Sequence, residues 1–427
     1  MDSRYFMTYS VPYLDMELRN HIRFYEVVNI FEYIYGDFVK EIILPRGPDS
    51  IIKSFGNELK SDLVITKNLL KLSDINTIKY LINLGADIHS EDDNLICWAA
   101  RNNHSDIIRL LIESGSNIHA QNDYPIRLSS EYGHIDVVKL LIELGAIFAC
   151  PRGDKLIGDQ LSIHAQKDYP IRLSSENGHI DVVKLLIKYG ADIHIHDDSP
   201  LRLSVNNGHF DVVKLLINLG ANIYARNNEA MTLALENNHL EVVKLLIESG
   251  IDIHDSDRNY LSKAVRSGHE RMVKLLLELG TNVNAIDIIG LAAGCGYYKI
   301  AKLLIEFGAD IHARNDYPIR ISAERGYFEV VKLLIEFGAD IHARDDYPIR
   351  ISAEKGHFEV VKLLIEFGAD IHAYYDYPIV ISAKIGYFKV VKLLIEFGAN
   401  IHARDDSPIK CAIIHGSLET VKLLIES

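Results

Sequence analysis

The chain has 427 residues, of which 48% are apolar and 24% charged, values ordinary for a soluble globular protein. It carries 45 Lys and Arg against 59 Asp and Glu, which gives a net charge of −14. Such a charge disfavours binding to nucleic acid or to an anionic membrane, so we expect neither as a partner. The 4 cysteines lie far apart, which excludes a disulfide framework and a cysteine zinc site and indicates a reducing compartment such as the cytoplasm.

The sequence also lacks the features of a membrane-spanning or secreted chain. A helix needs about 20 apolar residues to cross a bilayer, and the apolar runs here are short. The N-terminus has no basic start followed by an apolar stretch, so no secretory signal is expected.

Residues 1–60 differ from the rest of the sequence and are rich in aromatic side chains. Apolar residues at helical steps predict a helix over about residues 16–35, and alternation predicts a strand over 38–44. We expect residues 1–60 to cover one end of the repeats that follow, because the terminal units of a repeat array need a cap. The alternative is a small module that recruits another protein.

Residues 61–427 form a tandem array. The block Gly-Ala-Asp-Ile-His, or a variant of it, recurs mostly at steps of 30 residues, and residues 308–337 differ from 338–367 at three of 30 positions. The blocks begin at Gly85, Gly115, Gly145, Gly190, Gly220, Gly250, Gly280, Gly308, Gly338, Gly368 and Gly398. Counting the second helix expected in each repeat gives about twelve units.

Residues 308–337 indicate what one unit forms. Tyr317–Glu324 predicts a short first helix, with Pro318 in its first turn, where the missing N–H is harmless. Apolar spacing predicts a second helix over Phe328–Phe337. Gly326 breaks the first helix, and Gly338 suits a left-handed C-terminal cap.

The segment that links one unit to the next reads as an extended turn over residues 340–346. Because Tyr is a poor N-cap, we expect Asp316 and its equivalents to supply the acceptor at the start of each first helix. Such a helical hairpin is too small to bury its apolar face alone, so neighbouring units must stack.

One step in the array measures 45 residues and contains about fifteen extra residues, near 147–162. Loops of this length are either functional or simply tolerated. The sequence leaves both a binding loop and a neutral insertion open.

The recurring Pro-Ile-Arg-Ile-Ser-Ala-Glu-x-Gly-His-Phe-Glu-Val-Val-Lys-Leu-Leu-Ile-Glu-x-Gly-Ala-Asp-Ile-His-Ala resembles the ankyrin repeat across about residues 61–427. The near-identical units and their Ile-His endings resemble the ankyrin families of giant DNA viruses of amoebae. The resemblance implies an all-α ankyrin-repeat solenoid with an N-terminal cap. It also implies a non-catalytic scaffold that binds proteins on the concave face formed by the fingers and first helices. The unit is three residues shorter than the family's usual length, so we expect short fingers.

The histidines recur with the unit, which indicates a structural role rather than a metal site. Nine occupy the Ile-His position and seven the turn between the two helices, out of 19 in all. No zinc-protease pair, phosphate loop or nucleophile arrangement is complete. We therefore expect no catalytic residues, no metal and no cofactor.

Residues 368–397 carry the most informative variation, because seven of their 30 positions differ from 338–367. Most of the changes replace charge by aromatic or aliphatic side chains in the finger or at the end of the first helix, as binding hot spots do. The candidate protein-binding residues are Tyr374, Tyr375, Tyr377, Val380, Ile385 and Tyr387, and Ile414 extends the patch. Neutral drift within a recently duplicated array is the alternative interpretation.

Three functions remain open at this stage. The first is a monomeric scaffold that binds protein partners, which are host proteins in the host cytoplasm if the viral resemblance holds. The second is an adaptor that delivers a target to a ubiquitin ligase through residues 1–60. The third is a structural component without a dedicated partner.

Overall fold

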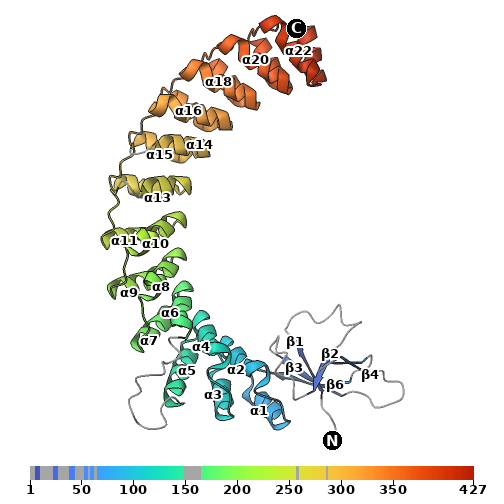
Figure 1. Cartoon of the computed structure of the whole chain (residues 1–427), viewed down its shortest axis with the longest axis vertical. Helices are drawn as coiled ribbons and strands as arrows, with labels where there is room; N and C mark the ends of the chain where they lie inside the picture. Colours follow the sequence, from blue (N-terminus) through green and yellow to red (C-terminus); the bar gives the residue numbers. More distant parts are fainter. Residues whose placement is uncertain are drawn as a thin grey trace. The chain divides into compact units, whose positions relative to one another are not determined.

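A computed structural model describes residues 5–9, 23–26, 38–43, 52–55, 58–61, 65–148, 165–255, 259–284 and 287–427. The chain divides into two compact parts, Met1–Ala230 and Met231–Ser427. Each part is described by itself, and Figure 1 gives the order of the elements along the chain. The extra residues near 147–162 fall mostly outside the described residues, since α5 is described only as far as Phe148.

The N-terminal segment contributes six antiparallel strands in the order β4-β5-β2-β1-β3-β6. The strands are β1 Tyr5–Tyr9, β2 Arg23–Glu26, β3 Phe38–Ile43, β4 Ile52–Phe55, β5 Glu58–Ser61 and β6 Ile65–Lys71. The strand predicted over residues 38–44 is confirmed as β3. The helix predicted over residues 16–35 is wrong at β2, which pairs with β1 and β5. Helical spacing of apolar residues did not reveal this pairing, because its partners are distant in sequence.

The array itself is all-α among the described residues 72–427, as predicted. The first helices are α2 Ser90–Arg101, α4 Ala120–Glu131, α6 Ala165–Glu176, α8 Ile195–Asn206, α10 Ala225–Glu236, α12 Tyr260–Arg266, α14 Ile288–Cys295, α16 Ala313–Arg325, α18 Ala343–Lys355, α20 Ala373–Ile385 and α22 Ala403–Ile414. The second helices are α1 Ile75–Asn83, α3 Ser105–Glu113, α5 Ile135–Phe148, α7 Ile180–Lys188, α9 Phe210–Asn218, α11 Leu240–Glu248, α13 Glu270–Glu278, α15 Tyr298–Glu306, α17 Phe328–Glu336, α19 Phe358–Glu366, α21 Phe388–Glu396 and α23 Leu418–Glu426.

The described residues thus contain the twelve second helices that were predicted, but only eleven first helices. Strand β6 runs where the first helix of the earliest unit is expected, and three residues separate its end from the start of α1. A backbone hydrogen bond of 3.1 Å from Asp74 N–H to the carbonyl of Lys71 joins the strand to the helix. The sheet therefore leads directly into α1, which is the second helix of the earliest unit.

Two kinds of glycine shape most units, as the sequence predicted, and Asn103 and Asn238 take the place of the first kind in two units. Gly326 ends α16 with φ +75° and Gly338 follows α17 with φ +92°, both in the left-handed region that favours glycine. The sharp turn at Gly326 lets α17 fold back along α16. The amide of Gly338 bonds the carbonyl of Ile335 at 2.9 Å, which satisfies one of the open groups at the helix end.

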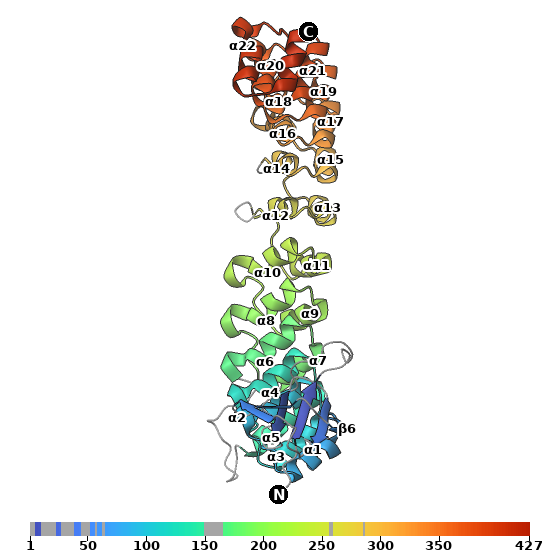
Figure 2. The same cartoon turned by 90° about the vertical axis from the view of Figure 1, so that its right-hand side faces the viewer.

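Within each part, first helices pack on first helices and second helices on second helices, so that two rows form (Figure 2). The core lies between the rows. Val331 and Leu334 of α17 are fully buried, and so are Ile319 and Ala323 of α16. A helical hairpin with this apolar face is stable only when its neighbours cover it. No helix among the described residues is long and apolar enough to cross a membrane.

Candidate functional site

A left-handed turn of three residues opens each of eight described first helices. In α18 these residues are Arg344, Asp345 and Asp346, with φ of 52°, 57° and 54°. The extended turn predicted over residues 340–346 is therefore wrong, because the chain coils left-handed before the right-handed helix begins. This compact turn takes the place of a longer finger, so the expectation of short fingers fits the geometry.

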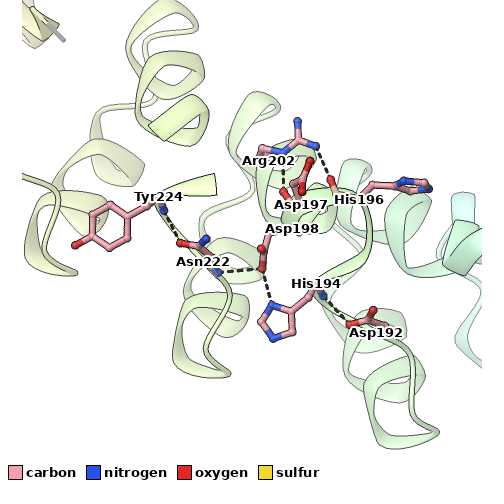
Figure 3. Close-up of polar contacts among 8 residues, drawn as sticks. All are labelled: Asp192, His194, His196, Asp197, Asp198, Arg202, Asn222 and Tyr224. Carbon is pink, nitrogen blue, oxygen red and sulfur yellow. Dashed lines mark hydrogen bonds and ion pairs between the residues drawn. The ribbon is translucent and has the colours of Figure 1, made fainter. Parts of the chain in front are cut away.

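The third residue of the turn joins neighbouring units. The Oδ1 atom of Asp198 lies 2.8 Å from Nδ1 of His194 and accepts the backbone N–H of Asn222 in the next unit at 2.9 Å (Figure 3). In turn, Asn222 Oδ1 accepts the backbone N–H of Tyr224 at 2.9 Å. Asp316 makes the same contacts with His312 and with the backbone N–H of Asp340. Its carboxylate therefore bonds both its own turn and the next unit.

Most of the Ile-His histidines take part in this arrangement. In seven of them the ring Nδ1 lies 2.5 to 3.1 Å from the aspartate four residues later: His89, His119, His194, His312, His342, His372 and His402. His164 lies outside the described residues. Hydrogen bonding to Asp123 raises the pKa of His119 above its ordinary value, against a smaller opposing effect of burial.

The turn histidines form a second set of contacts between units. His357 Nε2 donates to the carbonyl of Glu324 in the preceding unit at 2.9 Å, and its ring packs on Gly326. His134, His179, His209 and His269 make equivalent bonds of 2.8 Å. No group of three or more His, Cys, Asp or Glu side chains that could hold a metal ion occurs among the described residues.

Arginines and tyrosines alternate along the row of first helices. The guanidinium of Arg320 lies 5.6 Å from the ring centre of Tyr317 and 5.8 Å from that of Tyr347 in the next unit. The guanidinium of Arg350 lies 6.0 Å from the ring of Tyr347 and 5.9 Å from that of Tyr377. All four distances fit cation–π contacts, so each arginine lies between the tyrosine ring of its own unit and that of the next.

The hydroxyl groups of these tyrosines extend the contacts between units. Tyr377 donates to Glu354 of the preceding unit at 2.9 Å, and Tyr347 donates to Glu324 at 3.5 Å. Burial, together with the neighbouring glutamate, raises the pKa of both phenols above its ordinary value. These two tyrosines therefore stay neutral and act as donors within the scaffold.

Tyr374 and Tyr375 are the most exposed of the predicted binding residues. Their side chains are 55% and 77% exposed, and they occupy the first two positions of the left-handed turn that opens α20. The rings of Tyr374 and Tyr375 meet edge to face with centres 5.9 Å apart, and Tyr377 lies 6.3 Å from Tyr374. The structure thus brings three of the six candidates into one aromatic cluster.

The other three candidates lie elsewhere on α20 or beyond it. Val380 is only 9% exposed and offers little surface to a partner. Ile385 is 45% exposed but lies at the far end of α20 from the tyrosines. Tyr387 packs on Gly356 of the preceding unit, so it takes the place of a turn histidine. Ile414, at the end of α22, is 77% exposed.

Two arginines complete the cluster, and the sequence analysis did not single them out. The guanidinium of Arg350 lies 4.6 Å from the ring centre of Tyr374, and that of Arg404 lies 5.8 Å from the ring centre of Tyr375. Aligning the units would have drawn attention to Arg350, because arginine recurs at that position in Arg320. We call Tyr374, Tyr375, Tyr377, Arg350 and Arg404 the tyrosine cluster.

Comparison with known proteins agrees with this architecture. A sequence model of three ankyrin repeats matches residues 69–151, 146–227, 223–287, 289–375 and 350–427, nearly the whole of the array. The chain belongs to the ankyrin-repeat family. Ankyrin repeats are in general modules for protein–protein interaction.

One curated ankyrin relative comes from a giant virus. The chain is similar to a putative ankyrin repeat protein of Acanthamoeba polyphaga mimivirus, with 32% identity over 98 residues. The match covers 21% of this chain and 31% of the relative, so it spans about a third of that protein. The likeness to ankyrin proteins of amoebal giant viruses, expected from the near-identical units, is thereby confirmed.

Proposed function

We propose that this ankyrin array is a non-catalytic scaffold that binds a protein partner on the face formed by its left-handed turns and first helices. The tyrosine cluster is the centre of this surface. The observation that carries the proposal is that two adjacent tyrosines are both well exposed and held in a left-handed turn.

The backbone conformation of the pair is unusual for its side chains. Tyr374 has φ 50° and Tyr375 has φ 60°, a region that disfavours bulky residues by about 1–2 kcal/mol each. The equivalent positions in the preceding unit are Arg344 and Asp345, of which aspartate tolerates this conformation best. The other left-handed turns share this conformation, so what distinguishes α20 is that two large aromatic side chains stand in it.

The surroundings of the pair resemble those of a binding hot spot. Exposed charged residues occupy the same turn positions in the units on either side, namely Arg344 and Asp345 before and Arg404 and Asp405 after. An exposed aromatic centre with a charged rim is typical of the residues that dominate binding energy. Tyrosine also loses little conformational entropy on binding, because its side chain has only two rotatable bonds.

The rest of the proposal follows from composition and from the family. We propose that the partner is a protein, without nucleic acid, membrane, metal or cofactor, and that the chain acts as a monomer. The net charge of −14 supports this choice of partner. The likeness to a mimivirus protein supports a host protein in the host cytoplasm as the target. The sheet that leads into α1 supports an N-terminal cap.

A paired comparison tests the proposal. The full chain, Tyr375→Arg and Asn315→Arg are each used to capture proteins from a lysate of the cells in which the chain occurs. Asn315 is the matched control, because it has the same turn position two units earlier. We expect at least one captured protein to bind Tyr375→Arg about tenfold or more weakly, as for a hot-spot residue. The same protein should bind Asn315→Arg with unchanged affinity. If every captured protein binds all three chains equally, the cluster is not the binding surface.

A further inference from the structure

The carbonyl groups of the left-handed turns are bound by a basic side chain of the same unit. Arg320, four residues after its turn, donates from Nε to the carbonyl of Asn315 and from Nη2 to that of Arg314, both at 3.0 Å. Arg202 makes the equivalent pair of bonds at 3.0 and 2.9 Å. Arg350 donates to the carbonyl of Asp345 at 3.0 Å. The first helix therefore stabilises the turn that opens it.

This position is occupied by Val380 in α20, which has no donor. The carbonyls of the α20 turn are bound instead by the next unit. Arg404 donates from Nε to the carbonyl of Tyr375 at 2.9 Å and from Nη2 to that of Tyr374 at 2.6 Å. One guanidinium thus holds both backbone carbonyls of the tyrosine pair and also lies against the ring of Tyr375.

The same exchange occurs in α2, which belongs to the other compact part of the chain. There the basic residue is replaced by Cys97, four residues after the turn formed by residues 91–93. The side chain of Gln121, at the first turn position of the next unit, donates to the carbonyl of Glu91 at 2.9 Å. Gln121 and Arg404 occupy the same position in their units. In both α2 and α20 the basic residue is missing, and a side chain of the next unit donates to the turn carbonyls instead.

Where the basic residue is present, the first turn residue of the next unit has a different contact. Arg202 holds the turn of α8, and Arg226 of the following unit pairs with the carboxylate of Asp197 at 3.2 Å. In this pair of units the first turn residue of the next unit thus contacts a carboxylate instead of the turn carbonyls.

We propose that Arg404 is the positioning residue of the tyrosine pair, and that it takes over the carbonyl bonds which the residue at position 380 makes in other units. This inference deepens the proposed function, on which its biological meaning rests. The backbone conformation that exposes Tyr374 and Tyr375 would then depend on the unit that follows them. The charge on a guanidinium makes these hydrogen bonds stronger than neutral ones.

Hydrogen exchange of the full-length chain, followed by mass spectrometry, tests the inference without a partner. In Arg404→Ala we expect amides of the α20 turn to exchange about threefold to tenfold faster, as for loss of about one net hydrogen bond. Arg404→Gln should give a smaller increase, because Gln121 shows that glutamine can reach a turn carbonyl. Arg344→Ala is the matched control, since the turn before it is held by Arg320.

The decisive variant is the double substitution of Val380→Arg with Arg404→Ala. It places the basic residue where other units have it, so exchange in the α20 turn should return to within about twofold of the wild-type rate. Absence of this rescue in a folded chain would overturn the inference. So would an equal increase in the turn of α16 when Arg344 is replaced. None of these outcomes depends on whether the tyrosine cluster binds a protein.

Discussion

The carboxylate of Asp346 and the backbone N–H of Asp370 join two consecutive units through a hydrogen bond of 3.0 Å. The same oxygen, Oδ1, lies 2.8 Å from Nδ1 of His342 within its own turn. Asp370 in turn accepts the backbone N–H of His372 at 2.8 Å, so the chain of hydrogen bonds continues within the next unit. Polar contacts as well as apolar packing therefore set the spacing of the units.

Replacing Asp346 tests how much this contact contributes. We expect Asp346→Ala to lower the free energy of unfolding in urea by about 1–2 kcal/mol, because an N–H and a histidine ring lose their acceptor. Asp346→Asn should cost less, because its amide oxygen still accepts the bond. Asp345→Ala is the control, since Asp345 shares the left-handed turn but its side chain is exposed. Equal losses at positions 345 and 346 would show that the turn conformation, and not the contact, is responsible.

The regular parts of the array could be predicted because glycine spacing and apolar spacing are local signals. Gly326 and Gly338 ended their helices as expected, and α17 began at the predicted Phe328. The left-handed turn was not predicted, since Asp345 tolerates positive φ without requiring it and Arg344 does not favour it. That conformation is held by Arg350 of the same unit and by contacts with the next unit, and neither is a local sequence signal.

The candidate site was predictable to a similar degree. Comparison of neighbouring units located Tyr374 and Tyr375, because a departure from a repeat stands out in sequence. It could not separate them from Val380, whose burial depends on how α20 packs against its neighbours. The role of Arg404 was also hidden, because its partners are backbone carbonyls and leave no pattern in the sequence.

The two kinds of glycine should respond differently to substitution. A Cβ atom at Gly326 would lie 2.5 Å from Nδ1 of His357, whereas at Gly338 it would meet nothing within 4 Å. Both have positive φ, so Gly338→Ala should cost about 1–2 kcal/mol of stability from conformation alone. Gly326→Ala should cost about 1–3 kcal/mol more, because the ring must move.

Urea unfolding of both glycine variants, each also combined with His357→Ala, separates the two contributions. Removing the ring should reduce the cost of Gly326→Ala and leave that of Gly338→Ala unchanged. An unchanged cost at Gly326 without the ring would mean that backbone conformation accounts for the whole effect.

Cys97 should be nearly inert toward alkylating reagents. Burial, with smaller effects of Asp92 and Asp93, raises the pKa of its thiol to about 12, so the reactive thiolate is scarce near neutral pH. Cys295 and Cys411 are partly exposed and should be labelled before Cys97 by iodoacetamide in the folded chain. Mass spectrometry of each cysteine peptide over time checks this order, with a urea-unfolded sample as the control in which the three thiols react alike. Labelling of Cys97 as fast as Cys411 in the folded chain would contradict the prediction.

His119 should give the chain a pH-dependent contribution to stability. Its ring Nδ1 lies 2.5 Å from Oδ1 of Asp123, and this hydrogen bond raises the pKa of His119 above the ordinary value of 6.5. Because the folded state binds the proton more tightly than the unfolded state, the stabilisation is complete below pH 6.5. It is lost as the pH rises through the raised pKa of the folded chain.

The stability difference between the wild-type chain and His119→Gln measures this contribution. In urea unfolding the difference should be larger near about pH 5.5 than near about pH 8.5, because only the protonated ring forms an ion pair with Asp123. NMR titration of the His119 ring should show its pKa falling toward 6.5 in Asp123→Asn. A stability difference that stays constant across this pH range would mean that the neutral ring bonds Asp123 as well as the protonated ring does. The contact would then stabilise the chain independently of pH.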